Sequence, residues 1–139
     1  MINWIFQSDI TERFITASPH KWVMNTQLFL EILHRDRLFY LQALKIDSVN
    51  NLRKILFNMN CQKISEYVDI YLDSRSLDEA SRSFIVKFFA YAFTEMNIEY
   101  LKEGATEPPQ QAALRYYDLT EPQLRIAIDN CVKRYQAMS

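Results

Sequence analysis

The sequence predicts an all-α protein, a single bundle of about six helices. Apolar residues recur at spacings of three and four along most of the chain, as on one face of a helix. One Gly and four Pro are too few for the tight turns of a sandwich or barrel. The 139 residues, 49% of them hydrophobic and 24% charged, are enough for one domain with its own core. We therefore expect one domain, over residues 1–139.

The N-terminal part of the chain predicts three helices. The first covers residues 2–15 and begins almost at the first residue, so we expect the natural chain to continue upstream. The second begins near Ser18, a good N-cap, and Pro19, whose missing N–H costs nothing in the first turn. The polar run HRDR at 34–37 interrupts the apolar pattern that extends to Leu44. We expect two helices here, or one helix with a break at this run.

Three further helices complete the expected bundle. Residues 49–72 form the clearest amphipathic pattern of the chain. A helix over residues 77–102 follows, with Ser76 and Glu79 as its capping box and Gly104 as its C-terminal stop. Two prolines at 108–109 prevent its extension, and Thr120 with Gln123 is read as the capping pair of a last helix over residues 120–136.

The helix over residues 77–102 is apolar over an arc of about 240°, wider than one packing partner requires. It is expected either to be central in the domain or to contact a second subunit on its outer side. The last helix has a similarly broad apolar face. We predict that these two helices form a four-helix homodimer interface through Phe89, Phe93, Met96, Tyr100, Leu124, Ile128 and Cys131.

Charge and cysteine content restrict the partners and the compartment. A net charge of −1 gives no field that attracts DNA, so this chain is not expected to bind DNA by itself. Cys61 and Cys131 are isolated thiols, which fits the reducing cytoplasm. The N-terminus has no basic region before its apolar residues, so no signal peptide is expected. Lys87 and Glu95 interrupt the longest apolar run, so no membrane span is expected.

No residue pattern indicates catalysis, a metal or a cofactor. Glu31 and His34 form an E-x-x-H pair, but a di-iron bundle needs a second such pair, and His20 follows Ala17 at that spacing. We expect His34 to be solvated or hydrogen-bonded. A phosphate-binding loop needs several glycines, and both cysteines are expected to be inert.

Aromatic residues make up 14% of the chain and are expected mostly in the core. The remainder could line a ligand cavity between helices, with polar groups that orient a small molecule. The candidates for these polar groups are His34, Tyr40, Tyr67 and Tyr71.

The segments HRDRLFYLQALKIDSVNNLRKILF (34–57) and FIVKFFAYAFTEMNIEYLKEGATEPPQQAA (84–113) resemble the C-terminal domain of TetR-family transcriptional regulators. The similarity extends over most of the chain. FYLQAL (39–44) and YLKEGATEPP (100–109) look most like the subgroup that regulates dihydroxyacetone kinase operons. Tyr100 stands where that subgroup often has Trp.

The resemblance implies a bacterial, non-enzymatic regulatory domain that forms a homodimer through its last two long helices. It implies an effector, either a small molecule or a protein, bound among the earlier helices. The expected pocket residues are Trp22, Phe29, Leu33, His34, Tyr40, Tyr67 and Tyr71. DNA would be contacted through an N-terminal helix-turn-helix, which nothing in this chain matches. The alternative function is a stand-alone helical module for protein–protein interaction.

Overall fold

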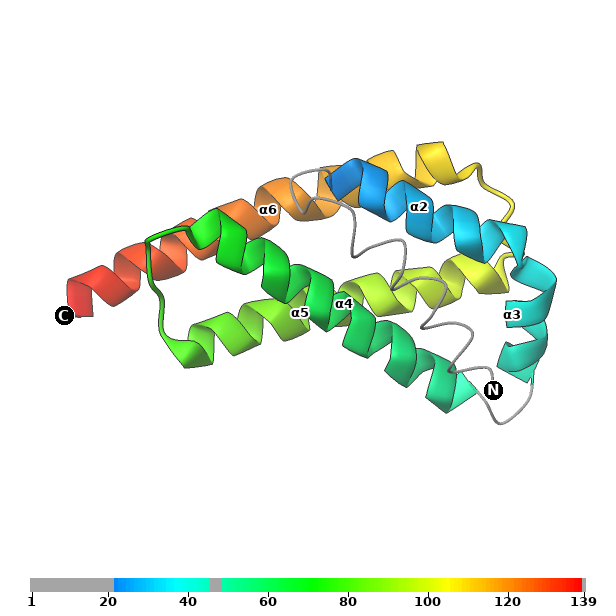
Figure 1. Cartoon of the computed structure of the whole chain (residues 1–139), viewed down its shortest axis with the longest axis horizontal. Coiled ribbons are helices and arrows are strands. Elements are labelled where there is room, and N and C mark those ends of the chain that lie inside the picture. Colours follow the sequence, from blue (N-terminus) through cyan, green and yellow to red (C-terminus); the bar gives the residue numbers. More distant parts are fainter. Residues whose placement is uncertain (1–21, 46–48, 139) are drawn as a thin grey trace.

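A computed structural model describes residues 22–45 and 49–138, and within these ranges the chain is helical without strands. Figure 1 shows the five described helices, labelled α2 to α6. The all-α prediction is confirmed, whereas the total of about six helices is not. The helix expected over residues 2–15 and the helix start expected at Ser18 and Pro19 lie outside the described residues.

The polar run at 34–37 divides the first described segment as expected. Helix α2 (Trp22–Arg35) ends there and α3 (Arg37–Lys45) begins. The Arg37 guanidinium donates to the carbonyl of His34 at 2.9 Å, so it satisfies a carbonyl that the end of α2 leaves without a helical partner. His34 Nδ1 lies 2.6 Å from the carbonyl oxygen of Ala105 and donates to it, since a carbonyl only accepts. This bond ties the α2–α3 corner to the turn between α5 and α6.

The long helices pack mainly as two pairs, α4 with α5 and α2 with α6. Helix α4 (Val49–Leu72) crosses α5 (Glu79–Lys102), while α2 lies along the N-terminal part of α6 (Pro109–Met138) (Figure 1). Helix α5 contacts each of the other four described helices. The pattern over residues 49–72 predicted α4 with the right bounds. Of the two alternatives that the broad apolar arc left open, the structure shows a central position for α5, while contact with a second subunit stays a prediction.

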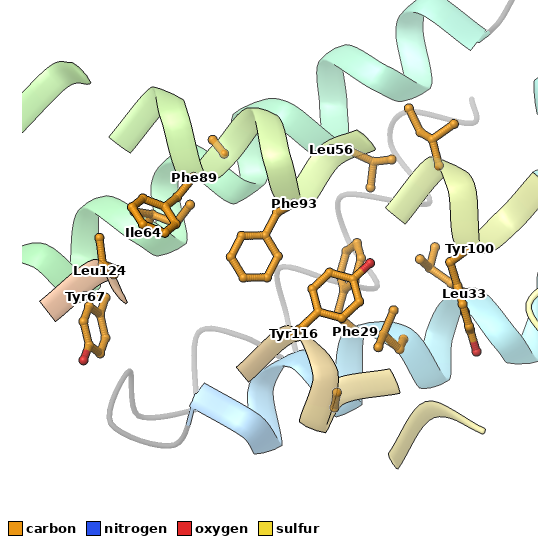
Figure 2. Packing of buried hydrophobic residues seen from close by; sticks show 14 of the residues in the cluster. Phe29, Leu33, Leu56, Ile64, Tyr67, Phe89, Phe93, Tyr100, Tyr116 and Leu124 are labelled. Atoms are coloured by element: carbon orange, nitrogen blue, oxygen red, sulfur yellow. The ribbon is translucent and has the colours of Figure 1, made fainter. Parts of the chain in front are cut away.

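The core is made of aliphatic and aromatic side chains from all five described helices and includes Leu30, Leu33, Leu56, Val68, Leu101 and Leu124, all with no exposed surface. Figure 2 shows Phe93 of α5 pointing to Tyr116 of α6, and the two rings stack with centroids 5.3 Å apart. Burial of one such Leu side chain contributes about 2 kcal/mol.

Both ends of α5 have identifiable caps. The N-cap is Asp78, whose carboxylate accepts the Ser81 N–H at 3.0 Å, so the expected Ser76–Glu79 box is wrong. Asp78 has the extended backbone of an N-cap, while Ser76 lies two residues before it. At the other end, Gly104 N–H donates to Leu101 and Ala105 N–H donates to Tyr100, and φ of Gly104 is +86°. This is a Schellman motif, so the glycine stop was correctly predicted.

The last helix begins at Pro109, eleven residues before the start expected at Thr120. Thr120 is not a cap, because its hydroxyl donates to the carbonyl of Tyr116 within the same helix. Pro122 lies inside α6 and leaves the carbonyl of Asp118 without its helical donor. Tertiary packing can hold a helix together through a proline, and α6 packs against α2, α4 and α5. None of the described helices is long and apolar enough to cross a membrane.

Gly104→Ala should lower the free energy of unfolding by about 1 kcal/mol, because φ of +86° is strained for a residue with a Cβ. Crowding adds little, since the nearest atom to a new Cβ would be Thr106 Cγ2 at 3.6 Å. Gly104→Asn should lose less, because Asn tolerates this conformation better. Urea unfolding measures both variants. Equal stability of the Ala variant and the parent would contradict the strain argument.

Candidate ligand cavity and the groove between α5 and α6

A cavity of about 70 Å³ lies among α2, α4 and α5. Figure 2 includes four of the side chains that line it, Phe29, Ile64, Tyr67 and Phe93. Its other lining residues are Trp22, Asn25, Thr26, Met59, Asn60, Lys63, Glu66 and Asn97. The walls are thus aromatic and aliphatic, with a few polar groups, which is the usual make-up of a small-molecule site.

Trp22 forms one aromatic corner of this cavity. Its ring lies edge-on to Tyr67, with centroids 5.0 Å apart, and is tilted against Phe93 at 5.6 Å. The indole Nε1 is buried and has no acceptor among the described residues. A buried N–H without an acceptor is costly, which makes this atom a candidate donor to a bound molecule.

A polar network leads from the cavity into the core. Asn60 Nδ2 donates to Thr94 Oγ1 at 3.0 Å and to Asn97 Oδ1 at 3.2 Å. Asn97 Nδ2 donates in turn to the Tyr116 hydroxyl at 3.2 Å. Thr94 and Asn97 are each only 2% exposed, so these bonds satisfy groups that water cannot reach. Burial is also the main reason that the pKa of Tyr116 is raised, although its bond with Asn97 acts in the opposite direction.

Three of the seven predicted pocket residues, Trp22, Phe29 and Tyr67, line the cavity. The other four lie elsewhere. Leu33 and Tyr40 are buried in the core, His34 bonds the Ala105 carbonyl, and Tyr71 bonds Asp129. The polar lining residues Asn60 and Asn97 were not among the predicted pocket residues. Each is an amide side chain within the apolar pattern of a helix. A buried amide needs a hydrogen-bond partner, so this pattern could have predicted a polar contact inside the protein.

Tyr67 also connects the cavity region to a buried carboxylate on α6. Its hydroxyl donates to Glu121 Oε1 at 2.6 Å, and Arg125 Nε lies 2.6 Å from the same oxygen. Burial first, and then the Glu121 carboxylate, raise the pKa of Tyr67 well above its usual value. Tyr67 therefore remains a neutral hydrogen-bond donor. Two side chains of α4 and α6 are joined in this way within the core.

The metal-ligating side chains of the described residues are dispersed. No group of three or more His, Cys, Asp or Glu side chains in these parts of the chain is placed to hold a metal ion. Burial raises the pKa of the Cys61 thiol, although Lys87 acts in the opposite direction. A higher pKa leaves less thiolate, which agrees with the expectation of an inert thiol.

A larger groove of about 390 Å³ lies between α5 and α6. Its floor is formed by the buried rings of Phe89, Phe93, Tyr100 and Tyr116. Its remaining lining residues are Phe88, Ala92, Met96, Glu99, Glu103, Glu107, Ala112, Arg115, Leu119 and Thr120. Several of the apolar side chains on this lining are exposed, as an interaction surface requires.

Four of the seven predicted interface residues, Phe89, Phe93, Met96 and Tyr100, line this groove, but only Met96 is well exposed. Leu124 and Ile128 have no accessible surface, so in this conformation neither can touch a partner. Cys131 is half-buried against the core. The reason is that the apolar stripe of α6 is used within the protomer, where α6 packs against α2, α4 and α5.

Tyr71, Arg75 and Asp129 form a polar cluster that joins the end of α4 to α6. Arg75 Nη1 lies 2.9 Å from Asp129 Oδ1, and the Tyr71 hydroxyl donates to the same carboxylate. The bond from Arg75 is the main reason that the pKa of Asp129 lies below its usual value. The pKa of Asp129 is therefore lower in the folded protein than in the unfolded chain. The stabilisation is fully present at a pH above the pKa of the unfolded chain, and it is lost as the pH falls through the pKa of the folded protein.

Asp129→Asn should therefore lower the free energy of unfolding at neutral pH by about 1 kcal/mol or less, since the cluster is partly exposed. The difference between parent and variant should shrink as the pH falls below about 4, where carboxylates protonate. Urea unfolding at neutral pH and below about pH 4 measures this difference in stability. A difference independent of pH would contradict the role of the carboxylate charge.

Comparison with known proteins agrees with this all-helical arrangement. A family model described as "Transcriptional regulator C-terminal region" (TetR_C_8) matches residues 20–122. A search of curated proteins and a search of solved structures found no significant match. The matched range includes the whole cavity lining and the whole groove lining. The chain therefore belongs to the TetR-type family of transcriptional regulator C-terminal regions.

Proposed function

We propose that this chain is the non-enzymatic regulatory part of a cytoplasmic transcriptional regulator. It binds an effector in the cavity among α2, α4 and α5, and it forms a homodimer through the exposed face of α5 and α6. The family to which the chain belongs supports a regulatory role. The observation that carries the dimer is the set of large apolar side chains left exposed on these two helices, which includes Phe84, Phe88, Met96, Leu119 and Ile126.

Spacing along both helices supports one continuous face. Phe84 and Phe88 are one helical turn apart on α5, and Ala92 and Met96 continue the same row. On α6, Leu119 and Ile126 are two turns apart. A two-fold dimer presents the same patch from both subunits, and two helices from each would form a four-helix interface. Burial of this apolar surface would supply roughly 25 cal/mol per Å².

The charges beside this face also suit a second copy of the chain. Asp118 is exposed beside Leu119, and Lys133 and Arg134 are exposed farther along α6. If α6 packs antiparallel to its copy with Ile126 near the two-fold axis, the acidic position of each copy meets the basic positions of the other. Opposite charges at such a rim favour the correct register more than they add affinity.

Phe93 supports a connection between the effector cavity and the dimer face, because it lines both the cavity and the groove. The network from Asn60 through Asn97 ends at Tyr116, another residue of the groove floor. An effector that favours a different arrangement of Phe93 or Asn97 would shift the population of dimer-face conformations. In an intact regulator, this shift would change the distance between the two helix-turn-helix domains of the dimer.

The alternative is a helical module that uses the same exposed face to bind a different protein. Both hypotheses use the same surface, and the mass of the isolated chain in solution distinguishes them. A homodimer has twice the mass of the chain in isolation, whereas an adaptor for another protein remains monomeric by itself.

Leu119→Glu and Phe88→Glu should convert the dimer to a monomer, because each places a charge on the proposed interface. Leu38→Glu is the matched control, since Leu38 on α3 is 74% exposed and Leu119 is 75% exposed. Light scattering measures the mass, and circular dichroism checks that each variant is folded. A parent that is monomeric at high concentration, or a Leu38→Glu variant that dissociates as readily, would overturn the proposed interface.

A further inference from the structure

We infer that the cavity takes a small uncharged ring compound with one hydroxyl-type group, of the size and chemistry of phenol. This rests on the proposed effector role of the cavity and specifies the class of ligand. The inference follows from the charge balance of the lining, from the polar atoms that it offers, and from its size.

The described lining residues carry no net charge to offer an ion. Among them Lys63 and Glu66 are the charged ones, and Lys63 Nζ lies 3.6 Å from Glu66 Oε2. The remaining polar groups are neutral amides, the hydroxyls of Thr26 and Tyr67, and an indole N–H. A buried carboxylate, phosphate or ammonium group without an opposite charge loses several kcal/mol of hydration. Anionic and cationic ligands are therefore selected against.

Two polar atoms would orient a neutral ligand. Trp22 Nε1 is a buried donor without an acceptor among the described residues. Asn60 uses its amide nitrogen for Thr94 and Asn97, which leaves its carbonyl oxygen to accept from a ligand. A hydroxyl both donates and accepts, so one such group on the ligand can satisfy both atoms. The rings of Trp22, Phe29, Tyr67 and Phe93 favour a flat apolar body for the rest of the molecule.

The size of the cavity restricts the ligand to a single ring. An apolar protein cavity of about 150 Å³ holds benzene. The cavity here is about 70 Å³, so even one ring requires it to widen. Met59 on its wall is the flexible side chain that can give way.

The test is a fluorescence titration of the full chain carrying Trp4→Phe, which leaves Trp22 as its one tryptophan. Phenol, toluene, benzoate and benzylamine are the probes at about pH 7, where the last two are charged. Phenol should bind with saturation and about tenfold more tightly than toluene, as one or two neutral hydrogen bonds allow. Both ions should bind more than about 100-fold more weakly than phenol.

Asn60→Leu should weaken phenol binding toward that of toluene, because it removes the acceptor and leaves only the Trp22 donor for the phenol hydroxyl. Asn58→Leu, at an exposed position of the same helix, is the matched control and should bind as the parent does. Met59→Ala should strengthen the binding of both neutral probes, because it enlarges the cavity. This variant also keeps the test decisive if Asn60→Leu does not fold.

Saturable binding of benzoate or benzylamine in place of phenol would overturn the inference about ligand class and leave the effector role intact. Absence of binding by both neutral probes in the parent and in Met59→Ala would also overturn it. Light scattering on the same samples separates this result from failure of the proposed dimer, because a chain that binds phenol as a monomer refutes the dimer alone.

Discussion

Helix α5 contacts every other described helix, and two polar side chains buried on it restrict how it can be placed. Thr94 and Asn97 are almost inaccessible to water, so each needs a partner inside the protein. Asn60 of α4 supplies the partner for both, and Tyr116 of α6 accepts from Asn97. A shift of α4 or α6 along α5 would leave these groups unpaired, at a cost of about 1–3 kcal/mol each. Apolar packing provides most of the stability, and this network provides register.

The same constraint determines where the cavity and the groove lie. The network leaves its first amide, Asn60, at the cavity and its last hydroxyl, Tyr116, at the floor of the groove. Phe93 lies between the two sites and borders both. A regulatory domain needs two sites whose free energies depend on one shared element. In the function that we propose, helix α5 is that element, because it borders both the cavity and the groove.

Sequence periodicity was sufficient to predict most of the helices, because a stripe of apolar residues over several turns is stable only as a helix on a core. It predicted α4, the break at residues 34–37 and the Gly104 stop. It failed where two local signals competed. Asp78 caps α5, whereas Ser76 was the predicted cap. Pro122 lies within α6, whereas Thr120 was predicted to begin the last helix. Propensity is a weak local term, and tertiary packing overrides it.

The candidate sites were predicted less well than the helices. A single sequence shows that Leu124 and Ile128 are apolar, but it does not show which neighbour buries them. Both are buried in the core of the protomer, so the proposed interface is formed by the exposed residues beside them. The polar part of the cavity was not predicted because its residues are far apart in the sequence. Its polar residues, Asn60 and Asn97, come from different helices, and only the packed structure places them together.

The most direct test of the central claim is a crystal structure of the chain as it assembles in solution. The account predicts a two-fold dimer in which Phe88 and Leu119 are buried against the partner subunit, while Leu124 contacts only its own protomer. A dimer formed through α3, with Leu119 left in solvent, would contradict it.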